Sequence, residues 1–260
     1  MKISQWLQLG PVITPLPVYH GDKFGLKELL NFEAMELREW WPESGALVDW
    51  DAHTRLTWQP LSADSEGVEL IPRADSPHPQ TAYLTTYIRA HRYVKAELQV
   101  RSHHLLAVYL DGKKVTDKTT SESKAGARAG KATHTLKLET GHHLLIIKTL
   151  RDPENAHPWR IQTTLKVDST FGKNALSPTL SSRQVMDIHR LLDSPQVSGV
   201  SISPDGKLAT VTIRQQIPGE DRAESYLELR RVSDGKLVQT FRGGTALSTV
   251  QWSPVGQRFA

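Results

Sequence analysis

Short segments of this chain alternate between apolar and polar residues, and the pattern predicts strands. Ala, Leu and Val alternate with Glu and Gln over residues 96–100, and residues 133–138 repeat the alternation. A period of two places the apolar side chains on one face of a half-buried strand. Residues 105–110 form an apolar run that ends at an Asp111-Gly112 hairpin turn.

Only one early segment has a helical pattern. Residues 25–31 follow Asp22 and predict two helical turns, and Pro42 ends any helix that reaches Trp41. Further strands are expected in the first 170 residues, at 56–58, 68–71, 82–90, 141–148 and 159–167. About eight strands separated by turn residues predict a jelly-roll-like β-sandwich with a short helical entry.

A short motif occurs twice near the end of the chain. Residues 200–207 read Val-Ser-Ile-Ser-Pro-Asp-Gly-Lys, and residues 250–257 read Val-Gln-Trp-Ser-Pro-Val-Gly-Gln. Ile202 and Trp252 hold equivalent places 50 residues apart. Strands are predicted between the copies at 208–213, 226–232 and 237–241. A strand-rich period of about 40 to 50 residues is typical of a β-propeller blade.

The structural residues of the propeller motif are those of its turns: Ser203, Pro204, Asp205, Gly206, Ser253, Pro254 and Gly256. Proline presets the first corner of such a turn, and glycine supplies a positive φ. The second copy departs from the first, with Val255 in place of Asp and Gln257 in place of Lys. Propellers close with about four to eight blades. The chain is therefore expected to be the front of a larger protein, cut inside its second blade.

The motif Ser203-Pro204-Asp205-Gly206-Lys207 resembles the blades of the amino-terminal propeller of prolyl oligopeptidase (S9) serine peptidases. It also resembles the related TolB-type propellers, which occur beside other enzymes as well. The resemblance covers residues 185–260. It implies a propeller that filters peptides above an α/β-hydrolase domain, with the catalytic Ser, Asp and His beyond residue 260.

Residues 80–167 resemble galactose-binding-like and PA14-like β-sandwich domains. In that family a strand ending in Leu-Asp-Gly-Lys precedes a Leu-x-x-Gly-x-His-x-Leu strand, here at 110–113 and 138–145. Such domains bind glycans in some proteins and serve as packing modules in others, and fold alone does not decide between these roles.

We therefore predict an all-β chain in two parts. Residues 1–170 form the jelly-roll-like β-sandwich accessory domain. Residues 171–184 are a Ser-rich linker. Residues 185–260 form a partial β-propeller segment of about one to one-and-a-half blades, namely the first blade and the start of the second.

The amino-acid composition limits the kinds of partner and chemistry that can be expected of the chain. The 32 Lys and Arg residues against 28 Asp and Glu residues give a mixed surface, so the net charge of +4 does not itself argue for nucleic acid. The one local basic excess, residues 118–131, is interpreted as a mobile loop, with binding of an anionic polymer as the alternative. There is no cysteine, which excludes disulfides and thiol catalysis. No cofactor is expected.

The sequence has no run of about 20 apolar residues, so no membrane span is expected. Its start lacks the apolar core of a signal peptide. A periplasmic or secreted location with the signal removed is expected, and a cytoplasmic location is the alternative.

A ligand site is predicted where tryptophans cluster. Trp40, Trp41, Trp50 and Trp58 lie close in sequence to Asp49, Asp51, His53 and Arg55. Aromatic faces beside polar side chains are the usual ingredients of a glycan site. The alternative is that these tryptophans pack the helical entry onto the sandwich.

No catalytic residue is predicted in this chain. The nearest approach to a Gly-x-Ser-x-Gly nucleophile, at residues 199–203, ends in Ser203 and lies in a predicted strand. The pairs His103-His104 and His142-His143 point to opposite faces of a strand, so neither pair can hold one metal ion. These histidines are expected to face solvent, and no metal site is predicted.

Two functions remain open. The first is the non-catalytic front end of a prolyl-oligopeptidase-like peptidase, whose missing catalytic domain would take the peptide substrate. The second is a glycan- or protein-binding module on a TolB-like propeller without peptidase activity. Unpaired blade edges pair readily with other chains, so self-association through edge strands is also expected.

Overall fold

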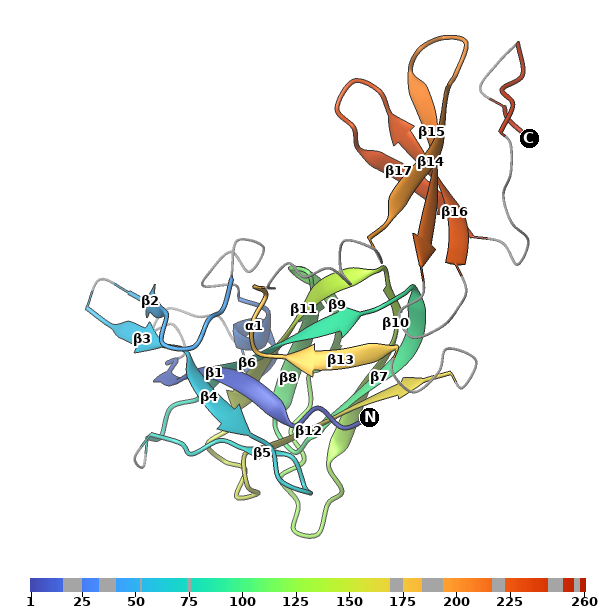
Figure 1. The fold of residues 1–260 in the computed structure, drawn as a ribbon. Helices are drawn as coiled ribbons and strands as arrows, with labels where there is room; N and C mark the ends of the chain where they lie inside the picture. The colour runs from blue at the N-terminus through green and yellow to red at the C-terminus, as the bar shows by residue number, and fades with distance from the viewer. Residues whose placement is uncertain are drawn as a thin grey trace. The chain divides into compact units, whose positions relative to one another are not determined.

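The computed structural model describes residues 1–15, 25–32, 41–51, 53–73, 76–168, 175–183, 194–216, 223–242, 250–254 and 258–260. The chain divides into two compact units, Met1–Gln184 and Val185–Ala260. Figure 1 shows that strands dominate both units, and α1 (Leu26–Asn31) is the one helix among the described residues. The all-β prediction is therefore confirmed.

Two antiparallel sheets form the first unit, and the β-sandwich prediction is confirmed. Among the described residues, the larger sheet has seven strands in the order β4-β1-β6-β11-β8-β9, with β13 also paired to β6. Its strands are β1 (Gln5–Ile13), β4 (Gln59–Ser62), β6 (Gln80–Ala90), β8 (Leu105–Leu110), β9 (Lys113–Lys118), β11 (Gly141–Arg151) and β13 (Leu176–Thr179). The smaller sheet has the order β10 (Gly130–Leu138), β7 (Val94–Ser102), β12 (Arg160–Val167) and β5 (Val68–Glu69).

The main core lies between the two sheets. Leu98 and Val100 of β7 point inward, and they join Leu84, Ile147 and Trp159 in one buried cluster. Burial of one such aliphatic side chain stabilises the fold by about 1.5–3 kcal/mol. The residues between them on β7 face outward, which is the alternation that the sequence pattern predicts.

A second core covers the other face of the larger sheet. Leu29 and Leu30 of α1 join Trp58, Tyr109 and Ile146 there. The hairpin of β2 (Leu47–Asp49) and β3 (Arg55–Thr57) adds half-buried side chains to the same cluster. The larger sheet is thus buried on both faces, which explains why the central strands β6 and β8 are almost continuously buried.

The first strand lies where the sequence pattern is interrupted. β1 contains Gly10-Pro11 in its middle, and its pairing with β6 is irregular between Leu9 and Val12. Proline has no backbone N–H to donate, so it is accommodated where the ladder is already broken. Residues 171–184, predicted to be a linker, include β13, which pairs with Tyr87–Ala90 of β6.

The two motifs of the sandwich resemblance meet in space. Asp111 and Gly112 have φ values of 50° and 73° and form the predicted tight turn between β8 and β9. One carboxylate oxygen of Asp111 accepts a hydrogen bond from the Leu144 amide at 2.9 Å, and the other lies 2.7 Å from Nδ1 of His143. The motif residues therefore fasten the turn to β11, which is a structural role.

The second unit contains a four-stranded antiparallel sheet with the strands in chain order. The strands are β14 (Gln196–Ile202), β15 (Leu208–Gln216), β16 (Ala223–Arg231) and β17 (Leu237–Phe241). Asp234-Gly235 forms the turn between the last two strands, with a φ of 67° at Gly235. All four strands agree with those predicted from the alternation.

Ser203 organises the turn between β14 and β15. Its hydroxyl accepts a hydrogen bond from the Leu208 amide at 2.9 Å and lies 2.6 Å from a carboxylate oxygen of Asp205. Pro204 lies between these two residues, and Gly206 follows with a φ of 69°. Ser203 and Asp205 thus supply hydrogen-bonding groups to the turn, and Gly206 supplies its positive φ.

The second copy of the motif repeats the backbone geometry of the first. The Ser203 amide donates to the Leu208 carbonyl at 2.8 Å, and the Ser253 amide donates to the Arg258 carbonyl at 2.8 Å. Ile202 pairs with Ala209 in the first copy, and Trp252 pairs with Phe259 in the second. Pro254 follows Ser253, and Gly256 lies outside the described residues. The repeat seen in the sequence is therefore also a repeat of strand register.

Candidate functional site

The predicted glycan site is centred on the β2–β3 hairpin, defined here as residues 47–57. Asp49 and Arg55 lie opposite each other at its end, and their side chains form an exposed ion pair at 2.7 Å. A carboxylate oxygen of Asp51 accepts hydrogen bonds from the amides of His53 and Thr54, both at 2.8 Å. These two bonds, that to His53 first, hold the pKa of Asp51 below its ordinary value. The polar residues of this hairpin thus stabilise its turn.

The three predicted tryptophans that the structure describes differ in exposure. Trp58 is only 3% exposed and belongs to the core beneath α1, so its ring is not available to a ligand. Trp50 is half-buried and lies 6.0 Å from the ring of Tyr83 between centroids. Trp41 is 72% exposed, and Trp40 lies outside the described residues. Packing therefore explains Trp58 and Trp50, and Trp41 is the exposed ring that remains for stacking.

A pocket of about 350 Å³ lies elsewhere on the sandwich. Arg101 of β7 and Gln162 of β12 are paired directly, and both line the pocket. Arg160 stands two residues before Gln162 on the same strand. We call this hollow the basic pocket, and its lining includes Glu66, Arg101, His103, Arg128, Arg160 and Gln162.

The charges of the basic pocket are only partly paired. Arg160 forms ion pairs with Glu66 and Glu69, while its buried Nε has no hydrogen-bond partner among the described residues. Arg101 donates from Nε to the side-chain oxygen of Gln99 at 3.2 Å. Arg128 is exposed and has no ion-pair partner within the described part of the chain. The arrangement leaves guanidinium groups directed at an open hollow of ligand size.

The residues of this pocket are not recognisable as a group in the sequence. Glu66, Arg101, Arg128 and Arg160 come from four separate segments, and no local motif joins them. The available signals were weak: the alternation of residues 96–101 places Arg101 on the outward face, and Arg128 belongs to the basic segment 118–131.

The histidine pairs correct the expectation that these residues face solvent. His104 is fully buried, with Nε2 3.1 Å from the His157 carbonyl and Nδ1 accepting from the Asp152 amide at 3.3 Å. His103 stacks on His157 with the ring centroids 4.2 Å apart. His143 is bonded to Asp111. Among the described residues, no group of three or more His, Cys, Asp or Glu side chains is placed to hold a metal ion.

The serines nearest to a nucleophile motif have structural positions. Ser201 lies inside β14 and pairs with Thr210 of β15. Ser203 is buried, and its hydroxyl is bonded within the turn. Neither serine has a histidine among the partners found in the described residues, so neither has the base that a nucleophilic serine requires.

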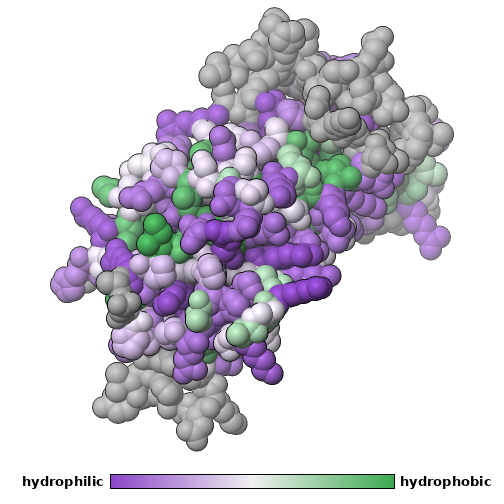
Figure 2. Space-filling model, turned by 90° about the horizontal axis from the view of Figure 1, so that it is seen from below, coloured by the Kyte–Doolittle hydropathy of each residue, from purple (hydrophilic) through white to green (hydrophobic). Residues whose placement is uncertain are grey.

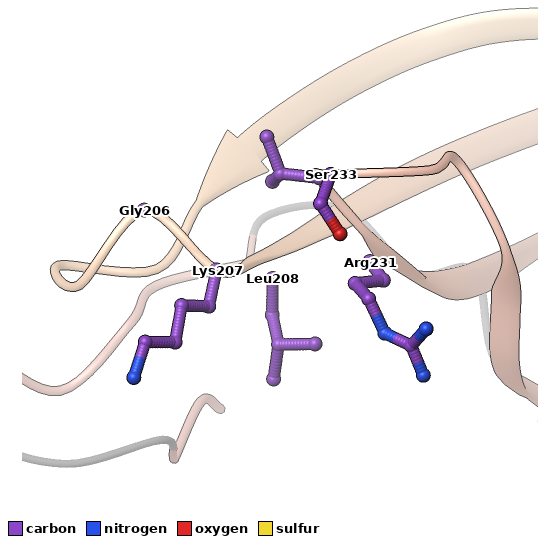
Figure 3. Close-up of a pocket in the computed structure, with 6 residues that line it drawn as sticks. Gly206, Lys207, Leu208, Arg231 and Ser233 are labelled. Carbon is purple, nitrogen blue, oxygen red and sulfur yellow. The ribbon is translucent and has the colours of Figure 1, made fainter.

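A second hollow, of about 490 Å³, lies at the turn end of the four-stranded sheet. Figure 3 shows the side chains of Lys207, Leu208 and Arg231 pointing to one side, with Ser233 above them. Leu208 and Arg231 are paired directly across β15 and β16. The described lining residues include the exposed Val232, which offers packing surface.

In the view of Figure 2 hydrophilic residues cover most of the described surface, and hydrophobic residues emerge in smaller groups. None of the helices in the described residues combines the length and apolar character that crossing a membrane requires.

Comparison with known proteins gives remote structural likenesses. No protein-family model and no curated protein matches the chain. A β-glucosidase from Kluyveromyces marxianus is similar to 48% of this chain, with 12% identity, a TM-score of 0.37 and 16% of its own chain covered. The PA14 domain of the MpAFP antifreeze protein is similar to 69% of this chain, with 14% identity, a TM-score of 0.32 and 87% coverage.

A β-glucuronidase from Ruminococcus gnavus is similar to 96% of this chain, with 10% identity and a TM-score of 0.32. The chain covers 46% of that enzyme. The chain thus spans less than half the length of either glycosidase. At this level of similarity, none of these proteins indicates what the chain binds.

Proposed function

We propose that the chain is the non-catalytic amino-terminal region of a prolyl-oligopeptidase-like serine peptidase. The sandwich is its accessory domain, and the four-stranded sheet is the first blade of a propeller that gates peptide access to a catalytic domain. The observation that carries the proposal is the repeat of register and hydrogen bonding at 50 residues, from Ile202–Ala209 to Trp252–Phe259.

The side chains on the two faces of the four-stranded sheet support its interpretation as a propeller blade. Strand pairing places Phe241 on one face, where its ring meets that of Phe259 from the second copy, 5.6 Å away between centroids. The opposite face carries Val197, Val200 and Ile202, which are 57–63% exposed. Blades stack face to face around an axis, so a first blade needs one neighbour on each face. The start of a second blade already touches one face, and the apolar face remains for the other neighbour.

The peptidase part of the proposal rests on the resemblance of the Ser-Pro-Asp-Gly-Lys motif at residues 203–207 to the propeller blades of prolyl oligopeptidase-like enzymes. The blade motif is shared with TolB-type propellers, so the motif alone does not separate a peptidase from a binding protein. The structural positions of Ser201 and Ser203 fit a region that supplies no nucleophile.

The test compares the full-length product of the parent gene with this chain alone. Both are treated with a fluorophosphonate probe and with a chromogenic peptide that contains proline. We expect the full-length protein to be labelled at one serine and to cleave the peptide, and the chain of residues 1–260 to do neither.

A folded full-length protein that is neither labelled nor active would refute the peptidase. Labelling of the isolated chain would refute its non-catalytic role. In the first case the alternative, a binding module on a propeller scaffold, is tested by glycan-array binding with Trp41→Ala, which removes the exposed ring. A Trp50→Ala variant provides the comparison, because that ring is packed against Tyr83.

A further inference from the structure

The outward face of the smaller sheet of the sandwich is polar along its three long strands. Side chains alternate along β7, β10 and β12, and the outward positions are Lys95, Glu97, Gln99, Arg101, Lys131, Thr133, Thr135, Lys137, Arg160, Gln162, Thr164 and Lys166. Strand pairing arranges them in rows, with Lys131, Arg101 and Gln162 in one row and Thr133, Gln99 and Thr164 in the next. This face therefore offers hydrogen-bonding groups and no apolar surface.

The basic pocket lies at one end of these rows. Arg101 and Gln162 come from the sheet, Arg128 comes from the segment before β10, and Glu66 comes from the turn before β5. Within the described part of the chain Arg101 forms one hydrogen bond, from Nε to the side-chain oxygen of Gln99, so its terminal N–H groups remain for another acceptor. Guanidinium groups recognise carboxylates through parallel, charge-assisted hydrogen bonds. Arg101 and Arg128 line the same pocket, so both guanidinium groups are available to a ligand carboxylate there.

The pocket also contains a carboxylate. Glu66 is held by Arg160, and Glu69 binds the same guanidinium. A carboxylate accepts hydrogen bonds from hydroxyl groups, whereas it repels a second anionic group placed against it. The lining therefore suits a sugar unit that carries one acidic group and several hydroxyl groups, such as one unit of an oligomeric uronic acid. A polyphosphate is less suitable because Glu66 opposes it, and the described lining residues include no Phe, Tyr or Trp for base stacking.

We infer that the basic pocket binds an acidic saccharide, whose carboxylate is held by Arg101 and Arg128 and whose hydroxyl groups bond to Gln162 and Glu66. The volume of about 350 Å³ lies within the usual range of about 300–1,000 Å³ for ligand pockets. The site is independent of the proposed peptidase, because it is built entirely from the sandwich.

The experiment measures binding of trigalacturonate to the whole chain by calorimetry at low salt. Maltotriose provides the neutral comparison, and a short oligothymidylate provides the polyphosphate comparison. The test variant is Arg101→Gln with Arg128→Gln. The matched control is Lys95→Gln with Lys137→Gln, which removes the same charge from a paired, exposed row at the other end of the face.

We expect trigalacturonate to bind and maltotriose to bind at least about tenfold more weakly, because charge-assisted hydrogen bonds are lost. The arginine variant is expected to lose about tenfold or more in trigalacturonate affinity, and the lysine control less than about twofold. Unchanged thermal melting of both variants confirms that they fold, since all four side chains are exposed.

Four results would overturn the inference. They are the absence of trigalacturonate binding, equal binding of maltotriose, equal losses in the arginine and lysine variants, and tighter binding of the oligothymidylate that disappears in the arginine variant. The last two would identify general charge attraction and a polyphosphate site, respectively.

Discussion

His104 should make the sandwich less stable in mild acid. Its ring is buried, and both nitrogens are already committed: Nε2 faces the His157 carbonyl, and Nδ1 accepts from the Asp152 amide. This geometry fixes the neutral tautomer with the proton on Nε2. A second proton on Nδ1 would point at the Asp152 N–H, so two hydrogen-bond donors would face each other. Acidification must therefore break a buried hydrogen bond or unfold the site.

The size of the effect follows from the pKa. Burial is the main cause that lowers the pKa of His104 to about 4, and the positive charges of Arg151 and Lys118 act in the same direction. An unfolded histidine titrates near 6.5. The unfolded chain therefore takes up the proton first, so the contribution is complete above pH 6.5 and is lost as the pH falls toward 4. The loss amounts to about 3 kcal/mol of unfolding free energy.

The assay is urea denaturation between pH 7.5 and 4, followed by tryptophan fluorescence, because Trp6, Trp58 and Trp159 are buried in the sandwich. The wild-type chain is compared with His104→Gln, which cannot titrate. We expect the stability advantage of wild type over this variant to shrink by about 3 kcal/mol across that range. His134→Gln, at an exposed position of β10, provides the control. Its unfolding free energy should show the same pH dependence as that of the wild-type chain. A constant difference between wild type and His104→Gln would refute the reasoning.

Three further predictions concern packing. Trp58→Ala should cost about 3–5 kcal/mol in urea denaturation because it empties the core beneath α1, and a loss below about 1 kcal/mol would contradict that placement. Gly67→Ala should lower the melting temperature more than Gly126→Ala: both have positive φ, but only at Gly67 would a Cβ lie 2.4 Å from the Ile161 carbonyl oxygen. Ile202→Lys should reduce concentration-dependent association in analytical ultracentrifugation, because it places a charge on the exposed apolar face; unchanged association would exclude that face.

Local chemistry made most of the strands predictable. The alternation in residues 96–100 needs only its own side chains, and the Asp111-Gly112 turn follows from the backbone freedom of its two residues. Four strands of the second unit are bounded in the same way by Ser203–Gly206 and Asp234-Gly235. Each of these signals lies within a few consecutive residues, so the strand or turn can be recognised without knowledge of the rest of the fold.

Features that depend on distant partners were not predictable in this way. β1 is interrupted by Gly10-Pro11, and β13 contains Pro178, so neither resembles a strand until it is placed against β6. The basic pocket draws on segments about 90 residues apart, such as Glu66 and Arg160. The exposure of the tryptophans depends on distant partners in the same way, because the sequence cannot tell that Trp58 joins the buried cluster of α1 while Trp41 is exposed.

The two histidine pairs show how far identical dipeptides diverge once they are folded. His104 is held neutral chiefly by its burial, and a backbone amide donates to its Nδ1. His143 presents Nδ1 to the Asp111 carboxylate at 2.7 Å and Nε2 to the Glu139 carbonyl at 2.8 Å, so both nitrogens face acceptors. Burial opposes its charge most strongly, yet the Asp111 and Glu139 interactions outweigh it and raise the pKa of His143. Its contribution to stability is present below pH 6.5 and fades as the pH rises through the folded value.

The pKa values of the two histidines are shifted in opposite directions, so the sandwich loses stability when the pH moves either way. His104 withdraws stability as the pH falls toward 4, and His143 withdraws it as the pH rises through its raised pKa. Both act on the larger sheet, since His104 directly precedes β8 and His143 lies in β11, the strand paired with it. The interval in which both contributions are present is set by the burial of His104 and by the contacts of His143 with Asp111 and Glu139. The sequence pattern His-His carries no information about those contacts, and therefore none about the direction in which either ring titrates.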